Sequence, residues 1–271
     1  MPSRARRGLF VVSVVVIVAV VGALGLRALW NAATSSDLFS GCSVGSYSLT
    51  TDQAAIASTM VGVATRRNLP ERASVLSLAA ALQESKLENL PINSGDRDSV
   101  GVLQQRPSQG WGTAAQLNDV HFATGAFLDA LVKLSGWQEQ PLAEAVQAVQ
   151  VSADGSAYAK HESEAQALAD ALTGATPAGI SCSFAKPTVV ATTAKVAAQV
   201  TRDLPVHTPV TTTRTVTVPG AHWQTAAWFV ANADRLGIES VAYNGKTWTR
   251  GGGWKTSHAP ASGVVATMYQ P

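Results

Sequence analysis

Apolar positions recur at helical spacing through most of residues 42–183, with polar segments between them. Residues 50–68 open with a capping box formed by Thr50 and Gln53 and keep one apolar face. Residues 70–85 are apolar on most sides, which is typical of a buried helix. Two helices are therefore predicted before residue 86.

Three further helices are predicted in the second half of this region. They cover 118–136, 140–152 and 156–174, and their end signals are Asn118 or Asp119 as an N-cap, Pro141 in a first turn, and Gly174 as a C-cap. No convincing strand interrupts them. Residues 42–183 are therefore predicted to form one all-α domain.

After residue 183 the pattern changes. An apolar helical face predicts a connecting helix over 184–205, carried by Val189, Val196, Val200 and Leu204. In residues 208–219 β-branched side chains alternate with others, which predicts a strand. Residues 220–237 are predicted to form an amphipathic helix. Further short strands are predicted around a turn at Asn244 and Gly245. Residues 206–271 are predicted to form a small α/β module.

The N-terminal segment has a membrane-anchor pattern. Leu9 to Leu26 carries no charge and, as a helix, spans about 27 Å, close to the hydrocarbon thickness of a bilayer. Arg4, Arg6 and Arg7 precede it, which favours a cytoplasmic N-terminus. We predict an anchor in residues 1–30 and a spacer at 31–41; a cleaved signal peptide stays open as the alternative. Either one exports the rest of the chain.

These elements predict an α+β multidomain chain with a transmembrane helix, an all-α domain and a small C-terminal α/β domain. Charge then narrows the possible partners. Residues 1–30 hold four arginines and no acid, so removing them from the formal net charge of +2 leaves −2 for the rest of the chain. No basic surface remains to neutralise phosphates, so nucleic acid is not expected as a partner.

The chain contains two cysteines, Cys42 and Cys182, at the two ends of the predicted helical domain. An exported protein can keep a disulfide, and an even count suits one. Two free thiols or a redox pair are the alternatives, although no C-x-x-C motif supports a redox pair. We predict a structural disulfide that joins the ends of the domain.

The stretch "ALQESKLENLPINSGDRDSVGVLQQRPSQGWG" holds the main candidate for chemistry, Glu84, at the end of the predicted helix 70–85. The negative end of the helix dipole and partial burial favour a protonated carboxyl group, and so does Glu88 four residues later if the helix continues to it. A held proton is what a general acid needs to protonate a glycosidic oxygen. A helix-terminal surface glutamate is the alternative.

Several residues after Glu84 suit a saccharide. Gly101 permits a close backbone approach, the amides of Gln104 and Gln105 suit sugar hydroxyl and acetamido groups, and Trp111 offers an apolar face to a sugar ring. Asp96 and Asp98 could activate a water as a second carboxylate, or could simply form turns in the loop.

On "ES" at Glu84-Ser85, "GDRDS", "SVGVLQQRPSQGWGT" and "AVQAVQVSADGSAYAKHE", residues 42–183 resemble the lysozyme-like domains of the soluble lytic transglycosylase and goose-type lysozyme group. A membrane-anchored actinobacterial branch of that group shows the greatest likeness. The resemblance implies cleavage of the β-1,4 bond between N-acetylmuramic acid and N-acetylglucosamine in peptidoglycan, without a cofactor. Glu84 would act as acid and then base, and Ser85, Gln104 and Gln105 would orient the glycan strand.

The same resemblance gives Tyr158 a role beside the catalytic carboxylate. In the transglycosylase reaction the muramyl 6-hydroxyl closes an anhydro ring, so no second carboxylate is required. The family's late Ala-Tyr-Asn-Ala-Gly turn is absent here, since residues 149–153 read Val-Gln-Val-Ser-Ala. Because of that departure, a second interpretation stays open: a lysozyme-like protein that binds peptidoglycan, or scaffolds the envelope, without cutting it. A partner or inhibitor of another envelope hydrolase is a further alternative.

The remaining candidates give no metal prediction. His161 with Glu162 and Glu164 could be drawn as a metal site, but a solvated helix face explains them without further ligands. "ANADRLGIESVAYNGKTWTRGGGW" resembles a small module appended to actinobacterial cell-wall proteins, and we expect it to be non-catalytic. Its aromatic residues fit either a ligand groove or a small core; they are Trp223, Trp228, Trp248 and Trp254. The expected location is the cell membrane, with the main part outside.

Overall fold

The computed structural model describes residues 40–94, 96–151 and 155–270. The predicted anchor at 1–30 and nearly all of the spacer lie outside these residues. None of the helices in the described part of the chain is long and apolar enough to cross a membrane.

Two antiparallel sheets and several helices make up the fold, so the prediction of an all-α domain over 42–183 is wrong. Three strands of this region form one sheet in the order β2-β1-β3, with β1 at Gly41–Val44, β2 at Tyr47–Leu49 and β3 at Ile180–Ser183. These strands are three or four residues long and contain Gly, Ser and Cys, so they lack the β-branched alternation that would reveal them in the sequence.

The predicted disulfide is confirmed and lies inside this sheet. Cys42 on β1 stands directly opposite Cys182 on β3, and the two are bonded across 140 residues of sequence. The sheet therefore closes the ends of the helical region against each other.

The helices of this region begin near their predicted start signals, but the helix predicted over 118–136 ends at Leu131 and the first part of that predicted over 156–174 is a 3-10 helix. They are α2 (Thr51–Arg66), α3 (Glu71–Ser85), α4 (Ala114–Leu117), α5 (Val120–Leu131), α6 (Leu142–Gln150) and α7 (Glu162–Thr173), with the 3-10 helices η2 (Pro107–Gln109) and η3 (Gly155–His161). The capping box of Thr50 and Gln53 is confirmed, Asp119 rather than Asn118 caps α5, and Gly174 ends α7. Pro141 stands one position before α6, as its N-cap residue.

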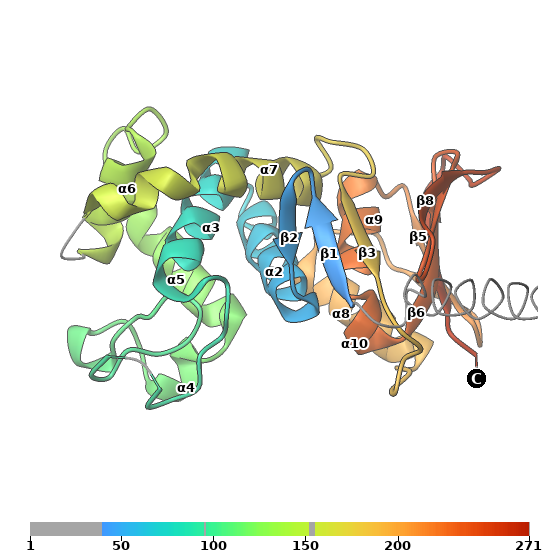
Figure 1. The fold of residues 1–271 in the computed structure, drawn as a ribbon, viewed down its shortest axis with the longest axis horizontal. Coiled ribbons are helices and arrows are strands. Elements are labelled where there is room, and N and C mark those ends of the chain that lie inside the picture. Colours follow the sequence, from blue (N-terminus) through green and yellow to red (C-terminus); the bar gives the residue numbers. More distant parts are fainter. Residues whose placement is uncertain (1–39, 95, 152–154, 271) are drawn as a thin grey trace, which may run out of the picture.

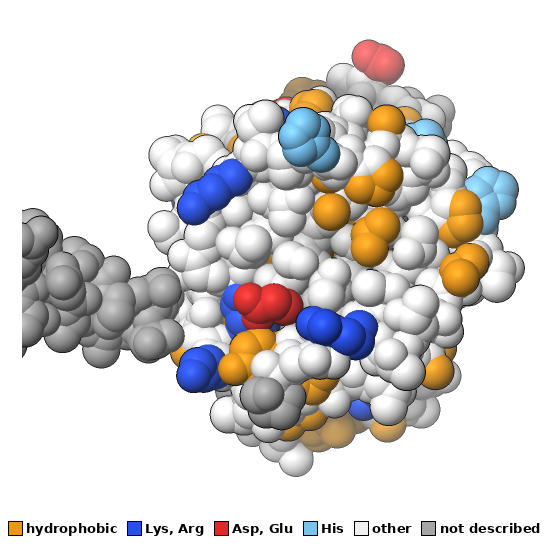
Figure 2. Space-filling model, turned by 90° about the vertical axis from the view of Figure 1, so that its right-hand side faces the viewer, with side chains coloured by type: hydrophobic (Ala, Val, Ile, Leu, Met, Phe, Trp, Pro, Cys, Tyr) orange, Lys and Arg blue, Asp and Glu red, His pale blue; other side chains and the backbone are white. Residues whose placement is uncertain are grey.

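The C-terminal residues form a six-stranded antiparallel sheet in the order β4-β5-β9-β6-β7-β8. Its strands are β4 (Val210–Thr211), β5 (Thr215–Pro219), β6 (Ile238–Tyr243), β7 (Lys246–Thr249), β8 (Gly253–Thr256) and β9 (Gly263–Met268). Strands are therefore confirmed in this region, but the single strand predicted over 208–219 is a hairpin of β4 and β5. Threonines 215, 217, 247, 249 and 267 alternate with buried residues, and Figure 2 shows that few charged side chains lie on the outer face.

The C-terminal helices pack against the first region. They are α8 (Thr193–Asp203), α9 (Trp223–Ala231) and α10 (Ala233–Leu236). Of the residues predicted as a helix over 184–205, only those of α8 are helical. Val189, which was predicted on the apolar face of that helix, precedes α8 and is 66% exposed. In Figure 1, α8 to α10 lie between the three-stranded and six-stranded sheets. Helix α9 contacts α2 and α7, and buried side chains from both regions form one continuous core.

The four tryptophans predicted as groove or core residues belong to this packing. Trp228 and Trp248 are fully buried, and Trp223 and Trp254 are half-buried with their ring centroids 5.4 Å apart. The indole N–H of Trp248 donates to the carbonyl of Cys182, and that of Trp254 donates to the carbonyl of Ile180. Trp248 and Trp254 thus join the two sheets, which favours the core interpretation.

Candidate functional site

Glu84 is the penultimate residue of α3, and its side chain is half-buried. The helix ends there because Lys86 and Leu87 take positive φ angles of 57° and 61°. The hydroxyl of Tyr158 donates a hydrogen bond of 2.5 Å to Oε1 of Glu84. Tyr158 is fully buried in η3, so the tyrosine holds the glutamate from inside the protein. The structure therefore brings together the predicted acid and its predicted partner.

Ser85 fixes the end of α3 to the following turn. Its hydroxyl donates 2.7 Å to the carbonyl of Val102 and lies 3.2 Å from the carbonyl of Ala81. Ser85 is only 8% exposed. Its hydroxyl is used inside the protein, where it fixes the backbone next to Glu84, and its contact with a substrate stays a prediction.

The turn at 100–105 is closed tightly against its surroundings. The amide of Val100 donates to the carbonyl of Gln105, and Gly101 has a φ of +74°. A Cβ on Gly101 would lie 2.4 Å from the carbonyl oxygen of Leu117, so only glycine fits there. The amide of Gln150 at the end of α6 donates 2.9 Å to the carbonyl of Leu103. α3, α4 and α6 thus all hold this turn.

The two glutamines of the turn use their amides inside the protein. Gln104 adopts a left-handed φ of +46°, and its Nε2 donates 2.9 Å to the carbonyl of Gly101. Gln105 is 2% exposed, and its Nε2 donates 3.3 Å to the carbonyl of Ala123. Gln104 keeps partial exposure, so it is the better placed of the two to reach a ligand.

The candidate second carboxylates lie in the loop before this turn. The carboxylate of Asp98 accepts three hydrogen bonds, from the amide of Ser108 at 2.7 Å, from its hydroxyl at 3.0 Å and from Nε of Arg106 at 2.8 Å. These contacts, the amide of Ser108 first, hold the pKa of Asp98 well below its ordinary value. The side chain of Asp96 is 89% exposed and lies 3.8 Å from Arg97. Asp98 therefore structures the loop.

Trp111 and His161, the two other residues considered in the sequence, contact neighbours within the protein. Trp111 is half-buried and packs against the edge of the core. The Nε2 of His161 lies 3.1 Å from Oε1 of Gln83, the residue before Glu84. Burial lowers the pKa of His161, and the charge of Lys160 lowers it further. Within residues 40–94, 96–151 and 155–270, no three His, Cys, Asp or Glu side chains form a candidate metal cluster.

Sequence reasoning missed two sets of polar residues. Gln150 supports the turn through a backbone carbonyl, and its place at the end of a helix gave only a weak signal. His121 and Asp203, 82 positions apart in the sequence, lie 2.8 Å apart. The structure alone reveals that pair, since no local spacing connects the two residues.

No protein-family model matches the chain, and no curated protein does. The chemistry of the site therefore has to follow from the contacts of its own residues.

Proposed function

We propose that the protein is a peptidoglycan glycosidase of the lytic transglycosylase type, with Glu84 as the catalytic acid and base. The observation that carries the proposal is the half-buried carboxyl group of Glu84 at the end of α3, held by the buried hydroxyl of Tyr158 at 2.5 Å. The resemblance of residues 42–183 to lysozyme-like domains supplies the substrate, the MurNAc–GlcNAc glycan strand. The predicted anchor would keep the enzyme at the outer face of the cell membrane.

The reaction requires one carboxyl group. The protonated Glu84 donates its proton to the glycosidic oxygen, which leaves as the 4-hydroxyl of N-acetylglucosamine. The Glu84 carboxylate then takes the proton of the muramyl 6-hydroxyl while that oxygen bonds to C1 and closes the anhydro ring. Glu84 ends the cycle protonated. The hydroxyl of Tyr158 stabilises the intermediate carboxylate and fixes its orientation.

The surroundings of the two loop carboxylates, Asp96 and Asp98, support ring closure rather than hydrolysis as the reaction. Asp98 is engaged by Arg106 and Ser108, so it is poorly suited to activate a water. Asp96 lies in open solvent, where a carboxylate gains little from its surroundings as a base. A single-carboxylate mechanism therefore fits the contacts better than a hydrolase with two acids.

A second function keeps some support: a lysozyme-like protein that binds peptidoglycan or scaffolds the envelope without cutting it. The amides of Gln104 and Gln105 are engaged inside the protein, and a cavity of about 690 Å³ elsewhere on the surface is not lined by Glu84. A binding role would use surfaces other than the predicted cleavage site.

The test compares the full-length chain with its Glu84→Gln variant on purified peptidoglycan, and the released fragments are weighed by mass spectrometry. We expect anhydro-muropeptides from the parent and none from the variant. Hydrated ends would keep Glu84 and bring Asp96 back as a water-activating base. Binding to the wall without release by either chain would favour the scaffold.

A further inference from the structure

Two exposed valines lie in the segment that leads from β3 to α8. Val189 is 66% exposed and Val190 is 41% exposed, and neither belongs to a helix or strand. A Cβ on Gly237, which has a φ of +69°, would lie 2.7 Å from the carbonyl oxygen of Val189 and 2.7 Å from Cα of Val190. Only glycine fits this approach, so the end of α10 fixes the backbone beneath the two valines.

Three exposed cations lie near these valines. Lys186 precedes them, Lys195 lies in the first turn of α8, and Arg214 lies between β4 and β5. In the described part of the chain, none of the three takes part in an ion pair. The segments 185–195 and 210–215 contain no acid. This part of the surface is therefore locally cationic, although the chain after residue 30 carries a formal net charge of −2.

Hydrogen bonds between distant segments bring the valines and the cations to one end of the molecule. The hydroxyl of Thr193 donates 2.8 Å to the carbonyl of Thr212, which joins the start of α8 to the turn that holds Arg214. The amide of Met268 donates 2.8 Å to the carbonyl of Arg214, and the next amide donates 2.9 Å to the carbonyl of Gly237. The strand that ends the chain thus connects the turn with Arg214 to the backbone beneath the valines.

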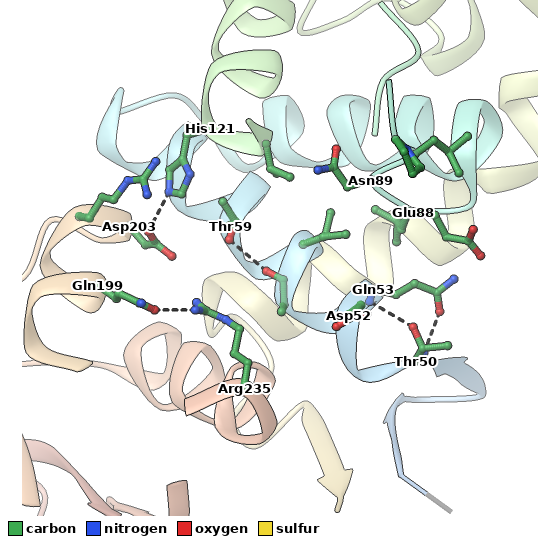
Figure 3. Close-up of a pocket in the computed structure, with 17 residues that line it drawn as sticks. Thr50, Asp52, Gln53, Thr59, Glu88, Asn89, His121, Gln199, Asp203 and Arg235 are labelled. Atoms are coloured by element: carbon green, nitrogen blue, oxygen red, sulfur yellow. Dashed lines mark hydrogen bonds and ion pairs between the residues drawn. The ribbon is translucent and has the colours of Figure 1, made fainter. Parts of the chain in front are cut away.

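The acids closest in sequence to Gly237 act on a buried arginine. Asp234 lies 2.5 Å from Nη2 of Arg250, and the charge of Glu239 acts on the same guanidinium group. Arg235, by contrast, belongs to the cavity of about 690 Å³, where its Nη1 donates 2.5 Å to Gln199 (Figure 3). Arg250 therefore offsets the repulsion that these two acids would add towards an anionic surface.

The chain that precedes the described residues joins the body at this same end. Gly41 of β1 stands opposite Ser183 of β3, and the amide of Ala185 donates 3.4 Å to the hydroxyl of Ser40. Ser40 therefore lies beside the start of the segment that carries the valines. The spacer between Leu26 and Ser40 reaches at most about 50 Å, so the predicted anchor by itself leaves the distance between the body and the bilayer open.

We propose that the valine and cation surface at this end rests on the outer leaflet of an anionic lipid bilayer. The residues of this surface are Lys186, Val189, Val190, Lys195 and Arg214. The cations attract the lipid phosphates, and the valines enter the boundary between the headgroups and the acyl chains. Because an anchored body stays at a high local concentration near the bilayer, a weak contact is sufficient.

This contact would orient the candidate site. Figure 1 shows α3 and α6 towards one end of the long axis and α8 and α10 towards the other. With the second end on the bilayer, Glu84 at the end of α3 would lie away from the membrane, on the side of the cell wall. The inference rests on the membrane location in the proposed function and not on the reaction at Glu84.

The test measures how close two labelled positions of the full-length chain lie to a bilayer. The vesicles contain three parts phosphatidylcholine, one part phosphatidylglycerol and a spin-labelled lipid that quenches a nearby fluorophore. Thr188→Cys carries the fluorophore next to the valines, and Ser135→Cys, also exposed and outside the helices and strands, is the matched control. We expect at least twofold stronger quenching at position 188. Salt at about 1 M, where the Debye length is about 3 Å, should reduce it.

Substitutions separate the surface from the tether, because the tether alone could bring position 188 near the bilayer. Lys186→Gln with Arg214→Gln should weaken the quenching at position 188 at least twofold, and so should Val189→Ser with Val190→Ser. Lys133→Gln, at an exposed cation after α5, is the control and should change nothing. Quenching that all these substitutions leave unchanged would overturn the proposal.

Flotation of the same samples distinguishes the other failures. A chain that floats with the vesicles and is quenched equally at positions 188 and 135 would overturn the surface and leave the anchor in place. A chain that does not float would overturn the surface together with the membrane location. The release of muropeptides is a separate measurement, so neither result decides the role of Glu84.

Discussion

At the scale of single residues, the Glu84 carboxyl group is positioned by neighbours that do not themselves react. Tyr158 reaches it from the buried side, and Ser85 ties the end of its helix to the turn at 100–105. The sequence places an acid at the end of a helix, and the resemblance alone names Tyr158. The engagement of Gln105 with the carbonyl of Ala123 could not be predicted, because a backbone acceptor leaves no mark in the sequence.

Replacing Tyr158 tests the support of the acid. Tyr158→Phe removes the hydrogen bond to Glu84 while the ring keeps its packing. A hydrogen bond to a charged group contributes about 1.5–3 kcal/mol, so we expect muropeptide release to slow by about tenfold or more. Initial rates of release measure it. An unchanged rate would remove Tyr158 from the account of the site.

Ser85 gives a separate test that concerns stability. Ser85→Ala leaves the buried carbonyl of Val102 without its side-chain donor, so the free energy of unfolding should fall by about 1–3 kcal/mol. Urea denaturation measures the change. Ser163→Ala, at an exposed position of α7, is the control and should change stability by less than about 0.5 kcal/mol. Equal effects of the two substitutions would contradict the role of Ser85.

At the scale of elements, helices were far easier to predict than short strands. Thr50 with Gln53 and Gly174 mark helix ends by local chemistry, and the structure confirms each of them. Strands β1 and β3 are stabilised by pairing across 140 residues and by a disulfide, so nothing local reveals them. The loop at 96–108 is neither a regular helix nor a strand, and the hydrogen bonds of one carboxylate, Asp98, hold it together.

This loop should show a defined pH dependence. The pKa of Asp98 is lowered in the folded protein, so its ionised form stabilises the loop above the ordinary value of 3.8. That contribution declines as the pH falls below 3.8 towards the lower pKa of the folded state. Melting temperatures of the parent and of Asp98→Asn should differ by a constant amount above pH 5 and converge in acid. A difference that grows in acid would contradict the assignment.

At the scale of the whole molecule, the C-terminal residues complete the core of the helical region. Helix α9 contacts α2 and α7, and Trp248 bonds to the carbonyl of Cys182, next to the disulfide. The sequence predicts the strands and helices of residues 206–271 but treats them as a module by itself. Their packing against the first region, and the cavity that results, depend on contacts between distant segments.

Removal of the disulfide tests how firmly the ends of the first region are joined. Cys42→Ala with Cys182→Ala opens a loop of 140 residues in the unfolded state. We expect the free energy of unfolding to fall by about 2–5 kcal/mol, although β1 and β3 still pair. Denaturation of the double variant beside the parent measures it, and an unchanged stability would contradict the expectation.

The most direct test of the central claim is the initial rate of muropeptide release by three full-length chains: the parent, Glu84→Gln and Glu139→Gln. Glu139 is an exposed acid in the turn before α6 and serves as the matched control. General acid catalysis typically contributes about 10²–10⁴-fold, so Glu84→Gln should lose at least about a hundredfold while Glu139→Gln keeps the parent rate. Equal rates for all three chains, or equal losses in the two variants, would contradict Glu84 as the catalytic residue.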